Sequence, residues 1–454
     1  MKLRVSRYCV SSQVSPKEYM LIQTLSGAVD IVDNGIIDAL DKIKQQKTPS
    51  LDSETQDYLF KRGYLTELNP KQETKKATHF FDRLQNHSKQ GSQYTFVITY
   101  DCNMRCTYCY EQHVLLWDSK KRNCALSISQ VDQAFKLIDE YDKDVPDHSR
   151  QPLRLFGGEP LLKKNRKIVE YILTQAIERN YKFGVITNGL QLDSFLSTLK
   201  LDNLELIFIT LDGPPEIHDR LRPTAGGGGT FERIAKNIDL TLKEGLPITI
   251  NYNFEKQNLP YIDKFQEIMV ERGWRDNPHL HSVFSSIFNL EAESEFEQST
   301  ISASEIIKNS KNKLEFLKEG LSGLHPFAEA ILNSKNWVPR IHHCGSNRQI
   351  SFDPLGDLYA CRLLIGKPKA KIGEYWPEFK PNELYTLWRK RSIATIPECR
   401  KCHLATLCGG GCPYRAVLNS ENVLSPHCDS IRPFLTHFVP NLYKVLRTSE
   451  NNDK

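Results

Sequence analysis

The chain has 454 residues, of which 39% are apolar and 25% charged, a composition that suits a folded protein of about three domains. Sixty lysines and arginines against 55 aspartates and glutamates leave a net charge of +5, too small an excess to support binding to nucleic acid or to an anionic membrane. No apolar run reaches the ~18 residues of a membrane span. The start, MKLRVSRYCV, lacks the apolar stretch of a secretory signal. We therefore expect a cytoplasmic protein with no membrane or nucleic-acid partner.

Residues 1–90 are predicted to form a small N-terminal domain followed by a linker. Two alternating apolar segments within 18–33 flank Ser26-Gly27, a pattern typical of a β-hairpin. Helical patterns follow at 36–43 and at 54–63, the second ending at Gly63. Residues 69–93 are polar, which predicts a linker or a surface helix.

From residue 94 onward, strand-like and helical segments alternate. Short apolar runs typical of strands occupy 94–100, 151–158, 182–188, 204–213 and 246–254, and helices are predicted over 129–142, 166–180 and 230–245. This alternation predicts βαβ units, and hence an α/β fold with a parallel sheet or barrel. Functional groups of such folds lie just beyond the carboxyl ends of the strands. Residues 285–335 are interpreted as a solvated connection into a third, cysteine-rich domain.

The twelve cysteines are clustered. Three lie within 102–109 and seven within 344–428, whereas Cys9 and Cys124 stand apart and are interpreted as packing thiols. In the reducing compartment that we expect, disulfides are rare, and clustered thiols more often hold metals or carry out redox chemistry. The two clusters therefore predict metal centres.

The first cluster, Cys102, Cys106 and Cys109, directly follows the predicted strand 94–100. Three thiolates on one loop can hold three corners of a [4Fe–4S] cubane, which normally takes four cysteines, and so leave one iron open to a small molecule. Zinc is the alternative, because a cysteine-rich loop can also contribute to a tetrahedral site. Zinc sites more often use pairs of CxxC, however, and no nearby pair completes this one.

The spacing CxxxCxxC after a first strand, with Tyr108 before the third cysteine, resembles the loop of the radical S-adenosylmethionine (SAM) enzymes. The resemblance continues through Gly157-Gly158-Glu159-Pro160, Thr187-Asn188-Gly189, Thr210-Leu-Asp212-Gly213-Pro214 and Arg222. It implies a partial (β/α)6 barrel of the TIM type over 91–335. It also implies SAM contacts at Tyr108, Gly157, Gly158, Glu159, Thr187, Asn188, Thr210 and Arg222, with the methionine amino group held at the Gly-Gly-Glu-Pro turn.

The seven downstream cysteines follow a fixed order: Cys344-x16-Cys361, then Cys399-x2-Cys402-x5-Cys408-x3-Cys412, then Cys428. By spacing alone, iron–sulfur clusters and a zinc ribbon both remain open. The order resembles the SPASM domain, a C-terminal extension of radical SAM enzymes with two auxiliary [4Fe–4S] clusters. Carried over by position within 336–454, the resemblance implies one cluster on Cys344, Cys361 and Cys412, and a second on Cys399, Cys402, Cys408 and Cys428.

The first auxiliary cluster would be one ligand short, so that substrate, solvent or another residue must fill its last site. His342 and His343 lie nearby in sequence, although histidines more often have structural roles. The N-terminal domain is similar to winged-helix-like peptide-recognition domains of enzymes that modify ribosomally made peptides, with a structural cap on the barrel as the alternative. An exposed strand edge would take a leader segment by β-augmentation.

The resemblance implies that one electron splits SAM into methionine and a 5′-deoxyadenosyl radical, which takes a hydrogen atom from a C–H bond. We predict an oxidoreductase or maturase that installs a thioether or carbon–carbon crosslink in a ribosomal peptide, with an electron donor such as flavodoxin or ferredoxin. No catalytic acid or base is assigned.

Two other functions remain as alternatives. One is formylglycine formation on a protein Cys or Ser, as in the related anaerobic sulfatase maturases. Against it, those enzymes have an aspartate where this chain has Arg362, and an extra cysteine where it has Ile350. The other is a zinc-stabilised binding module without catalysis, which leaves the 102–109 loop and the Gly-Gly-Glu-Pro turn without a task.

Overall fold

The computed structural model describes residues 3–49, 51–87, 91–117, 119–255, 257–286, 336–428 and 431–452. Apart from residues 285 and 286, the predicted connection 285–335 lies outside the described residues. The boundaries predicted at 90 and 335 adjoin segments that are not described, so the domain limits stay predictions. No helix among the described residues is long and apolar enough to cross a membrane.

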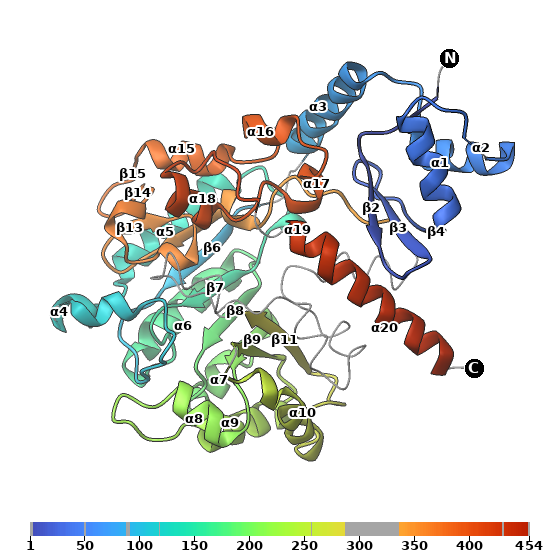
Figure 1. The fold of residues 1–454 in the computed structure, drawn as a ribbon. Helices are drawn as coiled ribbons and strands as arrows, with labels where there is room; N and C mark the ends of the chain where they lie inside the picture. The colour runs from blue at the N-terminus through green and yellow to red at the C-terminus, as the bar shows by residue number, and fades with distance from the viewer. Residues whose placement is uncertain are drawn as a thin grey trace.

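A ten-stranded sheet runs through the described part of the chain, in the order β11-β10-β9-β8-β7-β6-β12-β13-β14-β15 (Figure 1). The strands from β11 to β12 are parallel, and those from β12 to β15 are antiparallel. The bounds are β6 (Gln93–Val97), β7 (Leu153–Phe156), β8 (Phe183–Thr187), β9 (Leu204–Thr210), β10 (Ile248–Phe254), β11 (Leu280–Ser286), β12 (Gln349–Phe352), β13 (Asp357–Tyr359), β14 (Gly373–Glu374) and β15 (Lys380–Pro381).

Helices separate the six parallel strands β6 to β11 and confirm the predicted partial (β/α)6 barrel. They are α4 (Ser119–Arg122), α5 (Ile128–Tyr141), α6 (Arg166–Glu178), α7 (Leu196–Leu199), α8 (Pro215–Leu221), α9 (Phe231–Lys243) and α10 (Ile262–Glu271). Helix α5 illustrates why they form: Ser127 and Gln130 make a reciprocal capping box, and Val131, Ala134 and Ile138 recur at helical spacing and are buried. The apolar faces of these helices and the strands share one hydrophobic core.

The N-terminal unit, residues 3–66, combines small sheets and two helices. Strands β2 (Cys9–Gln13), β3 (Glu18–Gln23) and β4 (Val29–Asp33) form an antiparallel sheet in that order, and β1 (Arg4–Val5) pairs with β5 (Leu65–Thr66). Helices α1 (Asn34–Lys44) and α2 (Ser53–Lys61) are capped by Asp33 and Asp52. The predicted hairpin and both helices are thus present, and the polar segment that follows contains the helix α3 (Pro70–His87).

The C-terminal region continues the barrel sheet, because β12 pairs in parallel with β6. Its helices are α15 (Glu383–Lys390), α16 (Pro397–Arg400), α17 (Ala405–Cys408), α18 (Pro413–Ser420), α19 (Ile431–Pro433) and α20 (Val439–Asn452). The sequence patterns did not predict β2, β11 or β12. β12 is four buried residues, too short to show a period, and it depends on partners distant in sequence.

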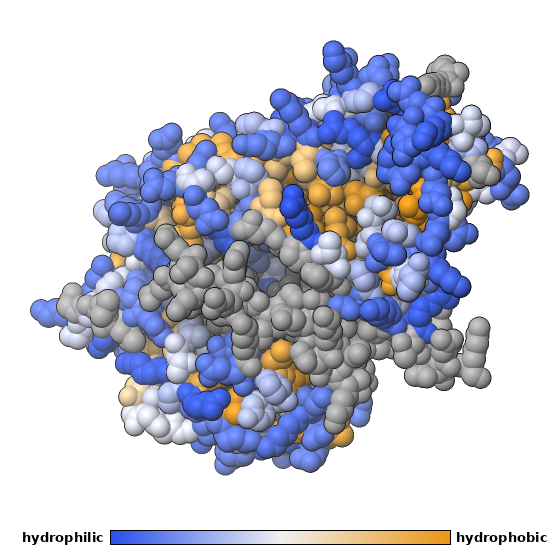
Figure 2. Space-filling model, viewed as in Figure 1, coloured by the Kyte–Doolittle hydropathy of each residue, from blue (hydrophilic) through white to orange (hydrophobic). Residues whose placement is uncertain are grey.

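The N-terminal unit is docked onto the C-terminal region, and Figure 2 shows apolar side chains between the two on the visible face. Tyr8, Phe81 of α3 and Ile396 belong to one buried cluster. The Thr24 hydroxyl donates to the carbonyl of His403 at 2.7 Å, and the Thr406 hydroxyl donates to the carbonyl of Thr24 at 2.5 Å. These bonds join the β3–β4 hairpin to the loop that carries Cys402 and Cys408.

Gly27 provides a test of this docking. It has φ +74°, and a Cβ there would lie 1.7 Å from the backbone oxygen of Trp337. We expect G27A to lower the free energy of unfolding by about 1–3 kcal/mol more than G273A, because its Cβ must displace backbone. Gly273 is the matched control, since it has φ +67° and open space around its Cβ position. Urea denaturation of both variants measures the difference, and equal losses would contradict the close packing.

Candidate active site

The motifs identified in the sequence meet at the carboxyl ends of neighbouring strands. The loop of Cys102, Cys106 and Cys109 follows β6, and the turn of residues 157–160 follows β7. Thr187 ends β8, and Thr210 ends β9, where it pairs with Asn251 of β10. Parallel strands place these ends at one edge of the sheet, so the side chains converge although they are separated by up to about a hundred residues.

The first cysteine loop is held by the segment that follows α8. The backbone nitrogens of Arg105 and Thr107 donate to the carbonyls of Pro223 and Leu221, both at 2.9 Å. Ala225 N donates to Asn103 O at 2.9 Å, and Met104 forms a β-bridge with Thr224. This pairing brings Arg222 against the cysteine loop.

The two glycines of the Gly-Gly-Glu-Pro turn permit close packing on the same loop. A Cβ on Gly157 would lie 2.4 Å from Thr99 O, and one on Gly158 would lie 2.4 Å from Asp101 O. The backbone nitrogens of Gly158 and Glu159 donate to these same two carbonyls at 2.8 and 2.9 Å. Any side chain here would push the turn off the cysteine loop, which explains the glycine pair.

Glu159 is buried and links the loops after β7 and β8. Its Oε1 accepts from the Thr187 hydroxyl at 2.6 Å and from Leu161 N at 2.8 Å, and its Oε2 accepts from Asn188 N at 2.7 Å. Burial raises the pKa of Glu159, while these three bonds act in the opposite direction. A bond from the SAM amino group to this carboxylate stays a prediction. In the structure, the carboxylate accepts hydrogen bonds from the chain's own donors.

Asn188 connects this network to the cysteines. Its Nδ2 donates to Asn103 Oδ1 at 2.7 Å and lies 3.8 Å from Cys102 Sγ, and Met104 N donates to the same sulfur at 3.5 Å. All three cysteines of the loop are free thiols. Free thiols on one anchored loop, with N–H donors directed at sulfur and a guanidinium nearby, fit the chemistry of an iron–sulfur cluster.

Tyr108 lies at the centre of a buried charged cluster. The Arg222 guanidinium donates to the Tyr108 hydroxyl at 2.7 Å, and that hydroxyl donates to the Asp212 carboxylate. Asn253 Nδ2 donates to the same hydroxyl at 3.2 Å. Burial raises the pKa of Asp212 to about 6, although Arg222 and these bonds favour its charged form. The cluster fixes Tyr108 and Arg222 beside Cys106, whose charge acts on the pKa of both.

His218 supports the backbone around this cluster. Asp212 N donates to His218 Nδ1 at 3.1 Å, which leaves the proton on Nε2, 3.1 Å from the Thr230 hydroxyl. That hydroxyl donates to Arg222 O at 2.7 Å. Burial lowers the pKa of His218 well below its usual range, so the ring is neutral and holds the Arg222 loop by hydrogen bonds alone.

Asp212, His218, Asn251 and Asn253 were not among the predicted site residues. Asn251 Nδ2 donates to Asn253 Oδ1 at 2.8 Å, and Ser285 of β11 donates to Asn251 Oδ1 at 2.8 Å. A signal was present: residues 251 and 253 are asparagines two apart in an otherwise apolar strand segment, so they lie on one face. Two asparagines on one strand face, Asn251 buried and Asn253 half-buried, indicate a polar interior.

The C-terminal cysteines fall into two neighbourhoods. Burial raises the pKa of Cys361 to about 12, and Cys344 and Cys412 add to the rise. Burial raises the pKa of Cys399 to about 12 as well, with Cys408, Cys402 and Cys428 adding to it. The thiols that shift each other's pKa thus form two sets. The first is Cys344, Cys361 and Cys412, and the second is Cys399, Cys402, Cys408 and Cys428. In the described ranges, no three His, Cys, Asp or Glu side chains are arranged to hold a single metal ion.

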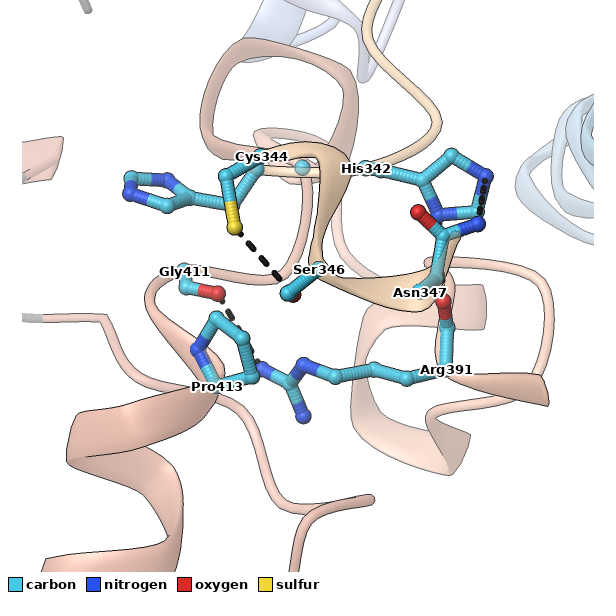
Figure 3. A pocket seen from close by; sticks show the side chains of 9 residues that line it. His342, Cys344, Ser346, Asn347, Arg391, Gly411 and Pro413 are labelled. Carbon is cyan, nitrogen blue, oxygen red and sulfur yellow. Dashed lines mark hydrogen bonds between the residues drawn. The ribbon is translucent and has the colours of Figure 1, made fainter. Parts of the chain in front are cut away.

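A small cavity, partly open to solvent, adjoins Cys344, and Figure 3 shows Ser346, Asn347 and Arg391 around it. His342 and His343 line it, but both rings have structural bonds, from Nδ1 to Arg391 O at 3.0 Å and to Cys408 O at 3.1 Å. His342 Nε2 also lies 3.2 Å from Asn347 Nδ2. Of the two, only His343 has a ring nitrogen without a described bond.

The site and the first C-terminal set adjoin each other through Tyr110. Its ring stacks on Phe156 at 6.5 Å, and its pKa is raised by burial with contributions from Glu111, Cys109 and Cys361. Glu111 is itself buried, and burial raises its pKa to about 8. The two regions therefore share one apolar boundary.

We expect E159Q to lower the free energy of unfolding by about 1–3 kcal/mol, because an amide NH₂ would face one of the three N–H or O–H donors. The exposed E170Q on α6 is the control and should cost little. Chemical denaturation compares the two. A neutral E159Q would contradict the three-donor arrangement.

Three comparisons with known proteins agree with this geometry. Residues 96–265 match the model of the radical SAM superfamily. A serine-type anaerobic sulfatase-maturating enzyme of Bacteroides thetaiotaomicron is 24% identical over 381 residues, which are 75% of this chain and 87% of that protein. The solved structure of anSMEcpe with bound AdoMet is similar with a TM-score of 0.56 and 20% identity, over 78% of this chain and 99% of that one.

Streptococcus suis SuiB, solved with its precursor peptide SuiA, is similar over more of the chain. The match has a TM-score of 0.53 and 13% identity, and covers 93% of this chain and 98% of SuiB. These likenesses show a shared fold. The matched segment 96–265 includes the cysteine loop and each strand-end motif of the site. Residues 96–265 therefore form a domain of the radical SAM superfamily, and this domain makes the protein a radical SAM enzyme.

Proposed function

We propose that this enzyme is a maturase that oxidatively modifies a peptide, by forming a thioether or carbon–carbon crosslink between side chains. The observation that carries the proposal is that one chain combines the SAM-type site, at the strand ends of the ten-stranded sheet, with an N-terminal unit and two sets of clustered cysteines. Each part has a task in this reaction, whereas a simple binding module would need none of the strand-end motifs.

The residues of this chain have distinct roles in the proposed reaction. Cys102, Cys106 and Cys109 would hold a [4Fe–4S] cluster. A bound cluster with SAM supplies reductive cleavage and a 5′-deoxyadenosyl radical that abstracts hydrogen. The turn 157–160 and Asn188 would shape the space for SAM beside the open iron. Tyr108 and Arg222 keep their positions through Asp212, and the buried barrel interior excludes water from the reacting groups.

We assign the two C-terminal sets as ligands of two auxiliary clusters, in the grouping that the resemblance to the SPASM domain implies. Cys344, Cys361 and Cys412 would hold one cluster, and Cys399, Cys402, Cys408 and Cys428 the other. The proximity within each set supports this assignment. A crosslink forms with the loss of two hydrogen atoms from the peptide. Abstraction removes one of them; the electron of the other would go to an auxiliary cluster, and its proton would be released to solvent. An external donor such as flavodoxin or ferredoxin would supply the electron that starts the cycle.

A peptide substrate is supported by the N-terminal unit. The SuiB match covers 93% of this chain. The part left uncovered is shorter than residues 3–66, so the match includes part of the N-terminal unit. β2 adjoins α20, and the Ser12 hydroxyl donates to Leu435 O at 2.6 Å, so one edge of the small sheet is covered. The β4 edge pairs only with β3 among the described residues. We propose that the leader segment of the peptide adds to β4.

Formylglycine formation is the second candidate, and the similarity to the serine-type maturating enzyme favours it. Arg362 directly follows Cys361 and lowers the pKa of Tyr110, so a cation occupies the position where the sulfatase maturases have an aspartate. A cation cannot accept the proton that leaves when formylglycine forms. We therefore rank the crosslink first.

Metal content tests the cluster assignment. After anaerobic reconstitution, we expect about twelve irons per chain, with similar sulfide and little zinc, as three cubane clusters require. About four irons per chain together with zinc would support the cluster of the SAM site and contradict the two auxiliary clusters. Zinc without iron would overturn the enzymatic proposal.

The C106A variant tests the first loop by itself. We expect it to lose about a third of the iron and all SAM cleavage, because only one cluster of three is affected. C124A is the control, since Cys124 lies outside both cysteine clusters, and the substitution keeps its backbone carbonyl, which accepts a bond from the Thr99 hydroxyl. Methionine and 5′-deoxyadenosine are measured by chromatography. Normal cleavage by C106A would refute the loop assignment.

Product chemistry separates the two candidate reactions. With a cognate peptide, we expect a loss of a pair of hydrogen atoms, a fragment pattern of a linked loop, and no reaction with a hydrazide probe. A product that reacts with the hydrazide contains an aldehyde and would favour formylglycine. Tandem mass spectrometry reads both outcomes in one sample.

A further inference from the structure

Arg391, the residue after α15, is buried between the loops that carry the C-terminal cysteines, with only 5% of its surface exposed. Its guanidinium donates to four backbone carbonyl oxygens: those of Gly410 at 2.8 Å, Gly411 at 3.1 Å, Ser425 at 2.7 Å and Val423. These carbonyls lie in the segments 410–411 and 423–425, which precede Cys412 and Cys428. The side chain therefore has one fixed position between the two segments.

Cysteine side chains of both sets lie close enough to this cation to act on its pKa. Burial lowers the pKa of Arg391, and the thiols of Cys399, Cys412, Cys344 and Cys408 oppose that shift. Two of these thiols belong to the first set and two to the second. Arg391 also lines the cavity beside Cys344 (Figure 3). It is thus placed between the two sets, not within one of them.

The hydrogen bonds of Arg391 to described residues all go to neutral carbonyls, which orient the guanidinium without balancing its charge. Burying a cation without a counter-charge is unfavourable, because nothing offsets the cost of removing it from water. Cysteine thiolates bound to iron would supply negative charge on both sides. Reduction makes a cluster more negative, so a fixed cation nearby stabilises the reduced form more than the oxidised one.

We propose that Arg391 is a fixed counter-charge shared by the two auxiliary clusters and that it raises the reduction potential of both. The inference rests on the proposed function, because it requires those clusters. Arg391 lies among the loops of the C-terminal cysteines and acts through the clusters, so it is a positioning residue. A higher potential makes the auxiliary clusters better acceptors for an electron from an oxidised substrate radical.

The test compares R391Q with R391K. Both are made in a protein whose Cys102, Cys106 and Cys109 are replaced by alanine, so that only the C-terminal clusters contribute to the spectra. EPR-monitored redox titration gives the midpoint potentials, and iron and sulfide analysis gives the loading, expected at about eight irons per chain. We expect lower potentials for both clusters in R391Q. R391K keeps the charge and should titrate close to the protein with Arg391.

R400Q is the matched control. Arg400 lies between Cys399 and Cys402 in sequence, but its guanidinium pairs with Asp82 at 2.9 Å, so its charge is already compensated. We expect its potentials to be unchanged. Potentials unchanged in R391Q, or lowered equally in R391K or R400Q, would overturn the proposal.

Two further outcomes are informative. If R391Q loses iron while R391K keeps both iron and potentials, the requirement for a positive charge is supported. If R391K itself shows lowered potentials, the charge is not what matters and the proposal fails. Absence of iron from the C-terminal region of the parent protein would refute the proposed clusters, whereas full iron with unchanged R391Q potentials refutes only the role of Arg391.

Discussion

Strand β6 pairs in parallel with β7 on one side and with β12 on the other, and the rest of the structure depends on this double pairing. Through β7 it joins the barrel, and through β12 it joins the cysteine-rich C-terminal region. The Tyr100 hydroxyl, just before the first cysteine loop, donates to Asp353 in the turn after β12 at 2.6 Å. The SAM-type site and the C-terminal cysteines are therefore parts of one rigid framework.

Within that framework, hydrogen bonds between different loops hold the site, because no single loop carries all of its residues. Glu159 gathers donors from the loops after β7 and β8, and Tyr108 gathers Arg222, Asp212 and Asn253 from three further segments. Buried polar groups are costly unless they are paired, so such networks hold a single geometry. A site that controls a radical needs this order, because small displacements expose other bonds to attack.

The N-terminal unit contacts the segment that carries the second cysteine set. Arg7 donates to Lys401 O at 2.7 Å, and across the same junction Thr24 donates to His403 O and accepts from the Thr406 hydroxyl. A peptide held at this unit would thus be positioned relative to the auxiliary region first. This arrangement supports a role of the C-terminal cysteines in the proposed reaction, in addition to a role in folding.

The sequence by itself determined the α/β class of the fold, the loop of three cysteines and the order of the strand-end motifs, because each is a local pattern of spacing or period. The choice of a barrel came from the resemblance to the radical SAM enzymes. Cys102, Gly157 and Thr187 are recognisable without knowledge of their neighbours in space. Only the tertiary structure decided that Glu159 bonds to the chain itself, and that Asn253 reaches Tyr108. It also decided the pairing of β12 with β6 and the place of Arg391. These features join segments up to hundreds of residues apart, and single-sequence periodicity carries no information on which distant groups meet.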